Sequence, residues 1–96
     1  MNQFLLQQLY KKDRFMLVSV EISYYPLVNN FSSPVNTFLD KIQKEDVKLE
    51  IGNMSSVITG EYLKVMKILT DIMGDLMEKF PSVFTIKLSN TCEIKY

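Results

Sequence analysis

The sequence has no histidine and no tryptophan, and its 96 residues include only one cysteine, three glycines and three prolines. Without histidine, the chain lacks the commonest ligand of transition metals and the commonest general base of serine and cysteine hydrolases. The single thiol, Cys92, has no second cysteine in the chain with which to form a disulfide. We therefore expect a protein with no metal and no cofactor that is not an enzyme and that resides in the reducing cytoplasm.

The chain also lacks an excess of charge of either sign and any long apolar run. Eleven basic side chains balance eleven acidic ones, and the two signs are interleaved, so no basic surface is expected to attract nucleic acid. No run approaches the roughly 20 apolar residues of a membrane-spanning helix. An apolar cluster near the start precedes Lys11 and Lys12, which is the reverse of the order in a secretory signal. Neither nucleic acid nor a membrane is an expected partner.

The length predicts one compact domain, because chains of about 100 residues rarely divide further. We expect an N-terminal extension at residues 1–15 and a single domain over residues 16–96. A chain of this size can bury a core between two layers but cannot surround a deep cleft on several sides. A ligand site is therefore expected to be shallow or to be shared between chains.

Hydrophobic periodicity predicts six elements of secondary structure. Alternating apolar and polar residues indicate strands at 15–27, 47–51, 55–60 and 83–89. Apolar residues at helical spacing indicate helices at 34–44 and 61–80. The resulting order, β-α-β-β-α-β, predicts an α+β fold of the ferredoxin-like kind, a four-stranded antiparallel sheet with two helices on one face.

Three positions are expected to mark the boundaries of these elements. Ser33 precedes a proline and is expected to cap the first helix. Gly52-Asn53 is expected to supply positive φ angles for the turn of a hairpin between the second and third strands. Pro81 is expected to end the second helix.

The sheet is expected to have one apolar and one mixed face. In the first strand, residues 16, 18, 20 and 22 are apolar and are expected to meet the helices. The opposite face would carry Leu17, Ser19, Glu21, Ser23 and Tyr25, together with Lys48, Glu50, Val83, Thr85, Lys87 and Ser89. Such a face is either solvated or covered by a second copy of the chain. Glu21 stands out, because a carboxylate in a central strand is costly unless it meets solvent, a partner or a cationic ligand.

Two short motifs resemble those of the YkoF-like thiamine/hydroxymethylpyrimidine-binding family. The stretch 22–27, Ile-Ser-Tyr-Tyr-Pro-Leu, is similar to that family's strand ending in Ser-x-Tyr-Pro and then Met or Leu. The stretch 52–56, Gly-Asn-Met-Ser-Ser, is similar to its hairpin, and Gly60-Glu61 to the Gly-Glu at the entry of its second helix. The resemblance covers residues 16–89 in matching order and spacing.

This resemblance implies a small cytoplasmic protein that binds thiamine or its pyrimidine moiety without transforming it and forms homodimers or homotetramers through its sheets. Ser23 and Tyr25 match the first motif, and Asn53, Met54 and Ser56 lie in the second. Ser56 stands where the family often has threonine, which keeps the hydroxyl. The residues before Met16 depart from the family, whose members commonly begin almost at the first strand.

The chemistry of such a ligand suits the side chains available. A flat aminopyrimidine can stack on tyrosine, and its amino group needs an acceptor such as Glu21 or a serine hydroxyl. The cationic thiazolium favours aromatic faces or carboxylates. The candidate ligand-binding residues are therefore Glu21, Ser23, Tyr25, Asn53, Met54 and Ser56.

The expected strand directions restrict this site. The first and third strands are expected to run parallel, which places Tyr25 near Gly60 and about 25 Å from the turn at 53–56, at about 3.3 Å per residue. One small ligand could then not touch both motifs within one chain. Two arrangements remain open, a pocket around Glu21, Ser23 and Tyr25 alone, or a site between subunits.

Two other functions remain open. The first is an oligomerisation or regulatory module with no small-molecule ligand, in which the polar sheet face is only a subunit contact. The second is an acylphosphatase-like enzyme on the same fold. Arg14, the only arginine, precedes the first strand, where it could not serve as a phosphate-cradling loop residue, and this disfavours the enzyme.

Overall fold

The computed structural model describes residues 16–91, so the predicted extension at 1–15, together with Arg14 and Cys92, lies outside the described residues. The chain forms, in order, β1 (Leu17–Pro26), α2 (Ser32–Gln43), β2 (Lys48–Ile51), β3 (Ser56–Glu61), α3 (Tyr62–Lys79) and β4 (Ser82–Ser89). The predicted order is confirmed, and the boundaries differ by only a few residues.

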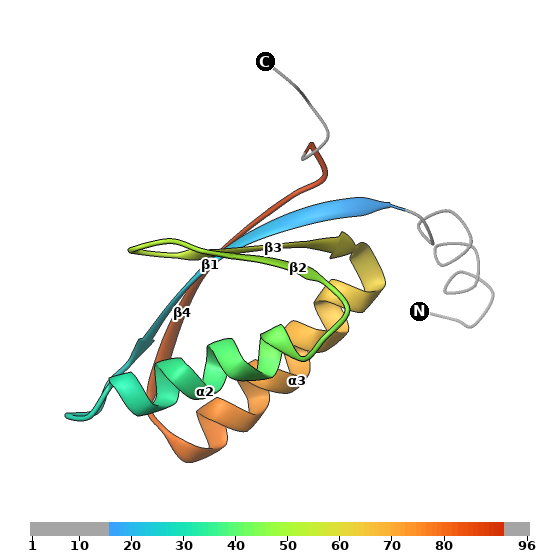
Figure 1. The fold of residues 1–96 in the computed structure, drawn as a ribbon. Coiled ribbons are helices and arrows are strands. Elements are labelled where there is room, and N and C mark those ends of the chain that lie inside the picture. The colour runs from blue at the N-terminus through green and yellow to red at the C-terminus, as the bar shows by residue number, and fades with distance from the viewer. Residues whose placement is uncertain (1–15, 92–96) are drawn as a thin grey trace.

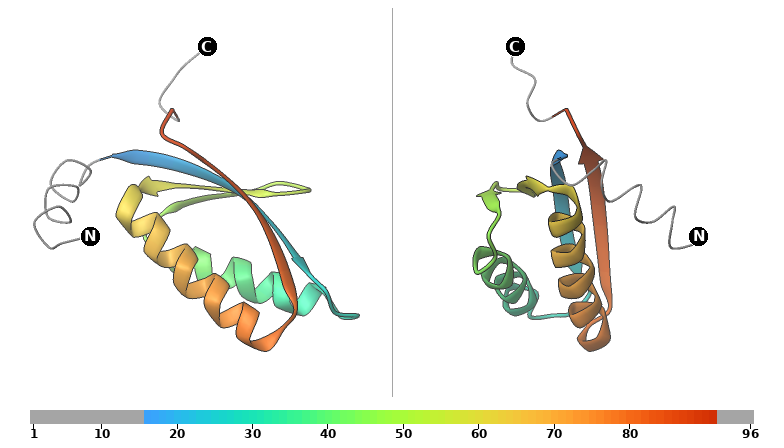
Figure 2. Two further views of the ribbon diagram at one scale, coloured as in Figure 1. Left: turned by 180° about the vertical axis from the view of Figure 1, so that it is seen from behind. Right: turned by 90° about the vertical axis from the view of Figure 1, so that its right-hand side faces the viewer.

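The four strands form one antiparallel sheet in the order β2-β3-β1-β4. Both helices cover the same face of this sheet (Figures 1 and 2). The predicted α+β, ferredoxin-like fold is therefore confirmed. Within the described part of the chain, neither helix is long and apolar enough to cross a membrane.

The hydrophobic core lies between the sheet and the two helices. Val18, Val20 and Ile22 of β1 are buried against the helices as predicted, because strand side chains alternate between the two faces, and Met16 just before the strand is half-buried. Each helix buries one stripe at helical spacing. The buried apolar residues are Val18, Val20, Ile22, Phe38, Ile42, Ile58, Val65, Ile68, Leu69, Ile72 and Leu76.

The predicted cap of α2 is wrong. The helix begins at Ser32, and the residue at the N-cap position is Phe31, whose side chain makes no capping hydrogen bond. Ser33 therefore lies inside the first turn, where its carbonyl oxygen accepts a hydrogen bond from the hydroxyl of Thr37 over 3.0 Å. The earlier start is compatible with Pro34, because the N–H groups of the first helical turn have no partner within the helix.

The predicted role of Gly52 is also wrong. No residue between 16 and 91 has a positive φ angle, so the hairpin turn does not use the left-handed region. Gly52 instead permits a close approach, because a Cβ atom at this position would lie 2.9 Å from the carbonyl oxygen of Ser55. The N–H of Gly52 donates to that same oxygen over 2.9 Å and closes the hairpin.

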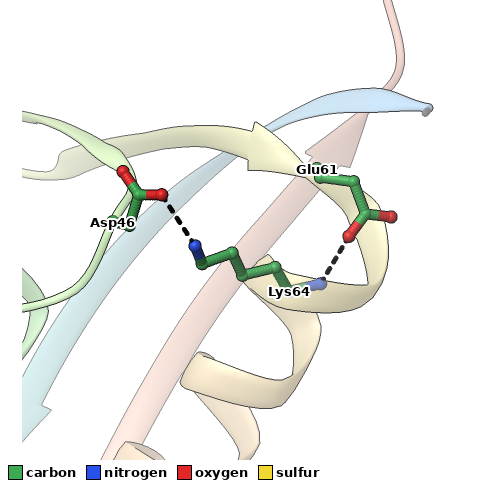
Figure 3. Close-up of polar contacts among 3 residues, drawn as sticks. All are labelled: Asp46, Glu61 and Lys64. Atoms are coloured by element: carbon green, nitrogen blue, oxygen red, sulfur yellow. Dashed lines mark hydrogen bonds and ion pairs between the residues drawn. The ribbon is translucent and has the colours of Figure 1, made fainter. Parts of the chain in front are cut away.

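The Gly60-Glu61 motif builds the junction between β3 and α3. A Cβ atom on Gly60 would lie 3.1 Å from the side chains of Val47 and Val65, so glycine allows close packing there. The Glu61 carboxylate caps α3 by accepting hydrogen bonds from the main-chain N–H groups of Leu63 and Lys64, each over 3.1 Å. Lys64 also donates to Asp46 over 2.9 Å (Figure 3). This motif therefore has a structural role.

The expected direction of the third strand is wrong. β1 and β3 are antiparallel neighbours, and Ile22 pairs with Ser56. The crossover through α2 makes β1 and β2 parallel, so the β2–β3 hairpin must run β3 against both of them. The start of β3 therefore lies beside the second half of β1, and the two motifs are adjacent within one chain.

Candidate functional site

Three segments meet at one end of the molecule, the end of β1, the turn of the β2–β3 hairpin and the start of α2. The antiparallel register places Ser56, at the start of β3, opposite Ile22. The connection from β1 to α2 spans only residues 27–31, so the start of α2 lies at this end as well (Figure 1).

Two adjoining hollows lie between these segments. The larger has a volume of about 400 Å³ and the smaller about 150 Å³. Four residues, Tyr24, Val35, Asn53 and Met54, line both hollows. The larger is completed by Tyr25, Pro26 and Phe31. The smaller is completed by Ile22, Ser23, Phe38, Leu39, Ile51, Gly52, Ser55 and Ser56. The larger one falls in the size range of small-molecule sites.

A side-chain hydrogen bond joins the two predicted motifs. The hydroxyl of Ser23 donates to the main-chain carbonyl oxygen of Met54 over 3.1 Å. Asn53 and Met54 form the tip of the hairpin, and the side chain of Met54 is 84% exposed. Tyr25, half exposed on the open face, lines the larger hollow with them. Five of the six predicted residues, Ser23, Tyr25, Asn53, Met54 and Ser56, therefore line the two hollows.

Ser56 and Glu21 lie on opposite faces of the sheet. Ser56 is buried on the helix side of β3 and lines only the smaller hollow. Glu21 lines neither hollow and lies on the open face beside the site. Its carboxylate accepts a hydrogen bond from the hydroxyl of Ser55 over 3.1 Å and lies 3.6 Å from the ammonium of Lys87. Glu21 thus contacts the hairpin through Ser55 and is exposed to solvent.

Aromatic rings form the inner wall of the site. Tyr24 stacks on Phe84 with ring centroids 4.5 Å apart and meets Phe38 at 5.4 Å in a tilted arrangement. Its hydroxyl lies 3.1 Å from that of Ser82. Because the Ser82 hydroxyl donates to the Phe80 carbonyl, Tyr24 is the donor in this pair. The hydroxyl of Tyr24 is therefore hydrogen-bonded within the protein, and Tyr24 lines both hollows.

Sequence reasoning missed four residues that line the larger hollow, Tyr24, Pro26, Phe31 and Val35. Tyr24 and Val35 have the periodicity of core residues, so the pattern marks them only as structural. Phe31 lies in the loop before α2 and is 62% exposed. A large exposed aromatic residue in a loop of turn-forming residues is the signal that could have indicated its role.

Two further hollows lie elsewhere in the described part of the chain. One, of about 340 Å³, is lined by Met16, Val18, Tyr62, Leu88 and Asn90 at the opposite end of β1. The other, of about 250 Å³, lies beside charged residues of α3. There Lys67 donates to Asp71 over 2.8 Å, and this hydrogen bond, followed by the charge of Asp71, raises the pKa of Lys67 above its ordinary value. Neither hollow contains a predicted ligand-binding residue.

Comparison with models of known protein families finds no match, and no curated protein matches the chain. Solved structures do match. A protein of Thermotoga maritima, named for a proposed role in thiamine biosynthesis or salvage, has a TM-score of 0.69 and 20% identity over 76% of this chain and 82% of its own. Protein SP2199 of Streptococcus pneumoniae has a TM-score of 0.72 and 18% identity over 77% and 86%. A Bacillus cereus domain of unknown function, DUF77, has a TM-score of 0.69 and 17% identity over 80% and 78%.

These comparisons define a class of small ferredoxin-like proteins to which the fold of this chain is similar. At 17 to 20% identity they establish a shared fold. The neighbours are consistent with the resemblance to the YkoF-like family, and one of them carries a thiamine-related name.

Proposed function

We propose that this protein belongs to the YkoF-like family and binds thiamine or its hydroxymethylpyrimidine moiety, without transforming it, at the two adjoining hollows. The observation that carries the proposal is the juxtaposition of the two motifs. Ser23 and Tyr25 on β1 and Asn53 and Met54 on the hairpin line the same site, and the Ser23 hydroxyl lies 3.1 Å from the Met54 carbonyl oxygen. One ligand can therefore contact both motifs within one chain.

The composition of the site suits a flat heterocycle with a few polar groups. Tyr24, Tyr25 and Phe31 supply ring faces for stacking. Ser23 and Asn53 supply a hydroxyl and an amide that can pair with the ring nitrogens and amino group of an aminopyrimidine. The combination of apolar walls with a few convergent polar groups is typical of small-molecule sites.

The positive charge of a thiazolium ring also finds suitable surroundings. Aromatic faces attract a cation through their quadrupole, and Tyr25 and Phe31 both line the larger hollow. The carboxylate of Glu21 lies beside the site and is held toward the hairpin by Ser55. We assign Glu21 an electrostatic contribution to binding and no direct contact within the hollows.

The chemistry of these residues supports a binding role without catalysis. The side chains that line the two hollows are apolar, aromatic, hydroxyl, amide or thioether groups. The lining contains no histidine, aspartate, glutamate or lysine, the side chains that most often act as general acids and bases. We propose that the protein holds its ligand in the cytoplasm for storage, sensing or delivery.

Calorimetric titration with thiamine and with hydroxymethylpyrimidine tests this proposal. We expect saturable binding of at least one of them, and an affinity reduced at least about tenfold in Tyr25→Ala, because the substitution removes a stacking surface. Leu27→Ala is the matched control, since Leu27 is also exposed but lines neither hollow. No heat with either compound at millimolar concentration, or equal affinities of the wild type and Tyr25→Ala, would overturn it.

The second candidate function is an oligomerisation module without a ligand. It is favoured by the open face of the sheet, where Tyr25 and Val83 pair across β1 and β4 and are both about half exposed. Assembly into a homodimer or homotetramer through the sheet is part of both proposals. Stable oligomers that bind neither compound would favour the module.

A further inference from the structure

A hollow of about 340 Å³ lies at the end of β1 that is remote from the candidate ligand site. Its lining is mostly apolar, with the phenol of Tyr62 and the amide of Asn90 as its polar side-chain groups. The other lining residues are Met16, Val18 and Leu88. This hollow has no part in the proposed ligand site.

The apolar lining of this hollow continues along β4 beyond the cover of the helices. Ile86 and Leu88 pair with Ile22 and Val20 and therefore point to the helix side of the sheet. Their partners are fully buried, whereas Ile86 is 43% and Leu88 47% exposed. In Figure 2, β4 leaves the helix layer toward its C-terminal end. The lining of the hollow and Ile86 thus form one uncovered apolar strip.

Residues 1–15 are attached at the rim of this hollow. The N–H of Tyr62 donates to the carbonyl oxygen of Met16 over 2.9 Å, and this hydrogen bond ties the start of β1 to the start of α3. Met16 itself lines the hollow. The segment that precedes Met16, which lies outside the described residues, therefore joins the domain where the apolar strip is uncovered.

The sequence of residues 1–15 suits this strip. Its apolar residues recur at positions i, i+1, i+4 and i+5, a spacing that predicts one face of a helix. They are Leu5, Leu6, Leu9 and Tyr10. Residues 11–15 separate this stripe from Met16, and connections of about two to six residues commonly join a helix to a strand. The connection is therefore long enough for the stripe to return to the hollow.

The net charges of the two parts are opposite. Residues 1–15 contain three basic residues and one acidic residue, whereas residues 16–91 contain seven basic residues and nine acidic ones. One of the acidic residues, Glu61, pairs with Leu17 in the sheet and so lies beside the point of attachment. Electrostatic attraction therefore favours the return of the basic segment to this end of the domain.

We propose that residues 1–15 fold back onto their own chain and cover the apolar strip, with the stripe of Leu5, Leu6, Leu9 and Tyr10 in the hollow. The segment then adds a further layer to the core, over Leu88. This inference assigns a role to the residues that depart from the YkoF-like pattern. It concerns the end of β1 remote from the ligand site and does not depend on the proposed function.

Tryptophan fluorescence tests this contact, because the chain has no tryptophan of its own. Tyr62→Trp places a single indole in the hollow, and we expect acrylamide to quench it poorly. Leu6→Glu/Leu9→Glu should raise the quenching constant at least about twofold, because loss of the apolar contact exposes the indole to water. Gln7→Glu/Gln8→Glu is the matched control. It adds the same charge to the segment, removes no apolar side chain and should leave the quenching unchanged.

Two further reporters locate the effect. Leu88→Trp repeats the measurement at a second position of the strip and should respond in the same way. Met77→Trp, at an exposed position of α3, should be quenched equally with and without the glutamates at positions 6 and 9. Circular dichroism shows that each variant is folded.

Refolding in mixtures identifies the occupant. The Tyr62→Trp chain is refolded with an excess of Leu6→Glu/Leu9→Glu chains, which carry no tryptophan. A segment that binds its own chain keeps the indole protected, whereas a segment supplied by another copy leaves the indole exposed. Exposure in the mixture overturns the inference. Equal quenching of the indole with and without Leu6→Glu/Leu9→Glu also overturns it, because the strip is then uncovered or covered by something other than residues 1–15.

Discussion

The hydroxyl of Ser23 donates a hydrogen bond to the main-chain carbonyl oxygen of Met54 over 3.1 Å, and this bond fastens the tip of the β2–β3 hairpin to the second half of β1. The two residues are 31 positions apart in the chain. Their contact turns two separate motifs into adjacent walls of one site. The position of the hairpin tip therefore depends on side chains of β1, on Ser23 at Met54 and on Glu21 at Ser55, and on the sheet register around them.

Ser23→Ala should loosen the hairpin and weaken binding of thiamine. The variant loses a hydrogen bond worth about 1 kcal/mol, so we expect an affinity about fivefold lower by calorimetry. Ser19→Ala is the matched control, because Ser19 lies on the same face of β1 and bonds to Thr59 over 3.0 Å, away from the hairpin. It should cost similar stability and leave the affinity unchanged. Equal affinities of both variants would show that the Ser23 bond does not organise the site.

Phe31→Ala should reduce affinity for thiamine with little effect on stability. The ring is largely exposed and lines the larger hollow, so its loss removes stacking and cation attraction of about 1 kcal/mol and little core packing. We expect a Kd raised about five- to tenfold and an unchanged melting temperature. Met77→Ala, at an exposed apolar position of α3, should alter neither. A Phe31→Ala variant that binds like the wild type would place the ligand elsewhere.

Tyr24→Phe separates the structural from the binding role of Tyr24. The substitution removes the hydrogen bond to Ser82 and keeps the ring stacked on Phe84. We expect the free energy of unfolding, measured with denaturant, to fall by about 1 kcal/mol, and thiamine affinity to stay the same. Ser82→Ala should cost at least as much, because it also loses the bond to the Phe80 carbonyl. A marked loss of affinity in Tyr24→Phe would instead assign the hydroxyl to the ligand.

Glu61→Ala should destabilise the fold without affecting the site. The carboxylate satisfies two main-chain N–H groups at the start of α3, and loss of an N-cap typically costs about 1 kcal/mol. Chemical denaturation should reveal this loss, and Glu61→Asp, a stronger capping residue type, should recover part of it. Titration with thiamine should give the wild-type affinity, since Glu61 lies at the other end of β3. Reduced affinity would contradict the structural role assigned to the Gly60-Glu61 motif.

Secondary structure and the two faces of the sheet were accessible from the sequence, because both are local consequences of periodicity. In β1 the even positions Val18, Val20 and Ile22 are buried, as their alternation predicts. The helix start at Ser32 and the turn at Gly52 were not accessible. A cap and a close main-chain approach depend on the atoms that surround them, which residue type alone does not specify.

The sequence by itself determined the elements, their order and five of the residues that line the candidate site. The tertiary structure decided that Ser23 and Tyr25 lie beside Asn53 and Met54, that Glu21 lies outside the hollows, and that Phe31 and Tyr24 help to line them. The reason is physical. Residue pattern follows from local burial, whereas the pairing of β1 with β3 follows from the hand of the crossover and the hairpin together. This pairing brings the side chain of Ser23 to the main chain of Met54, 31 positions away.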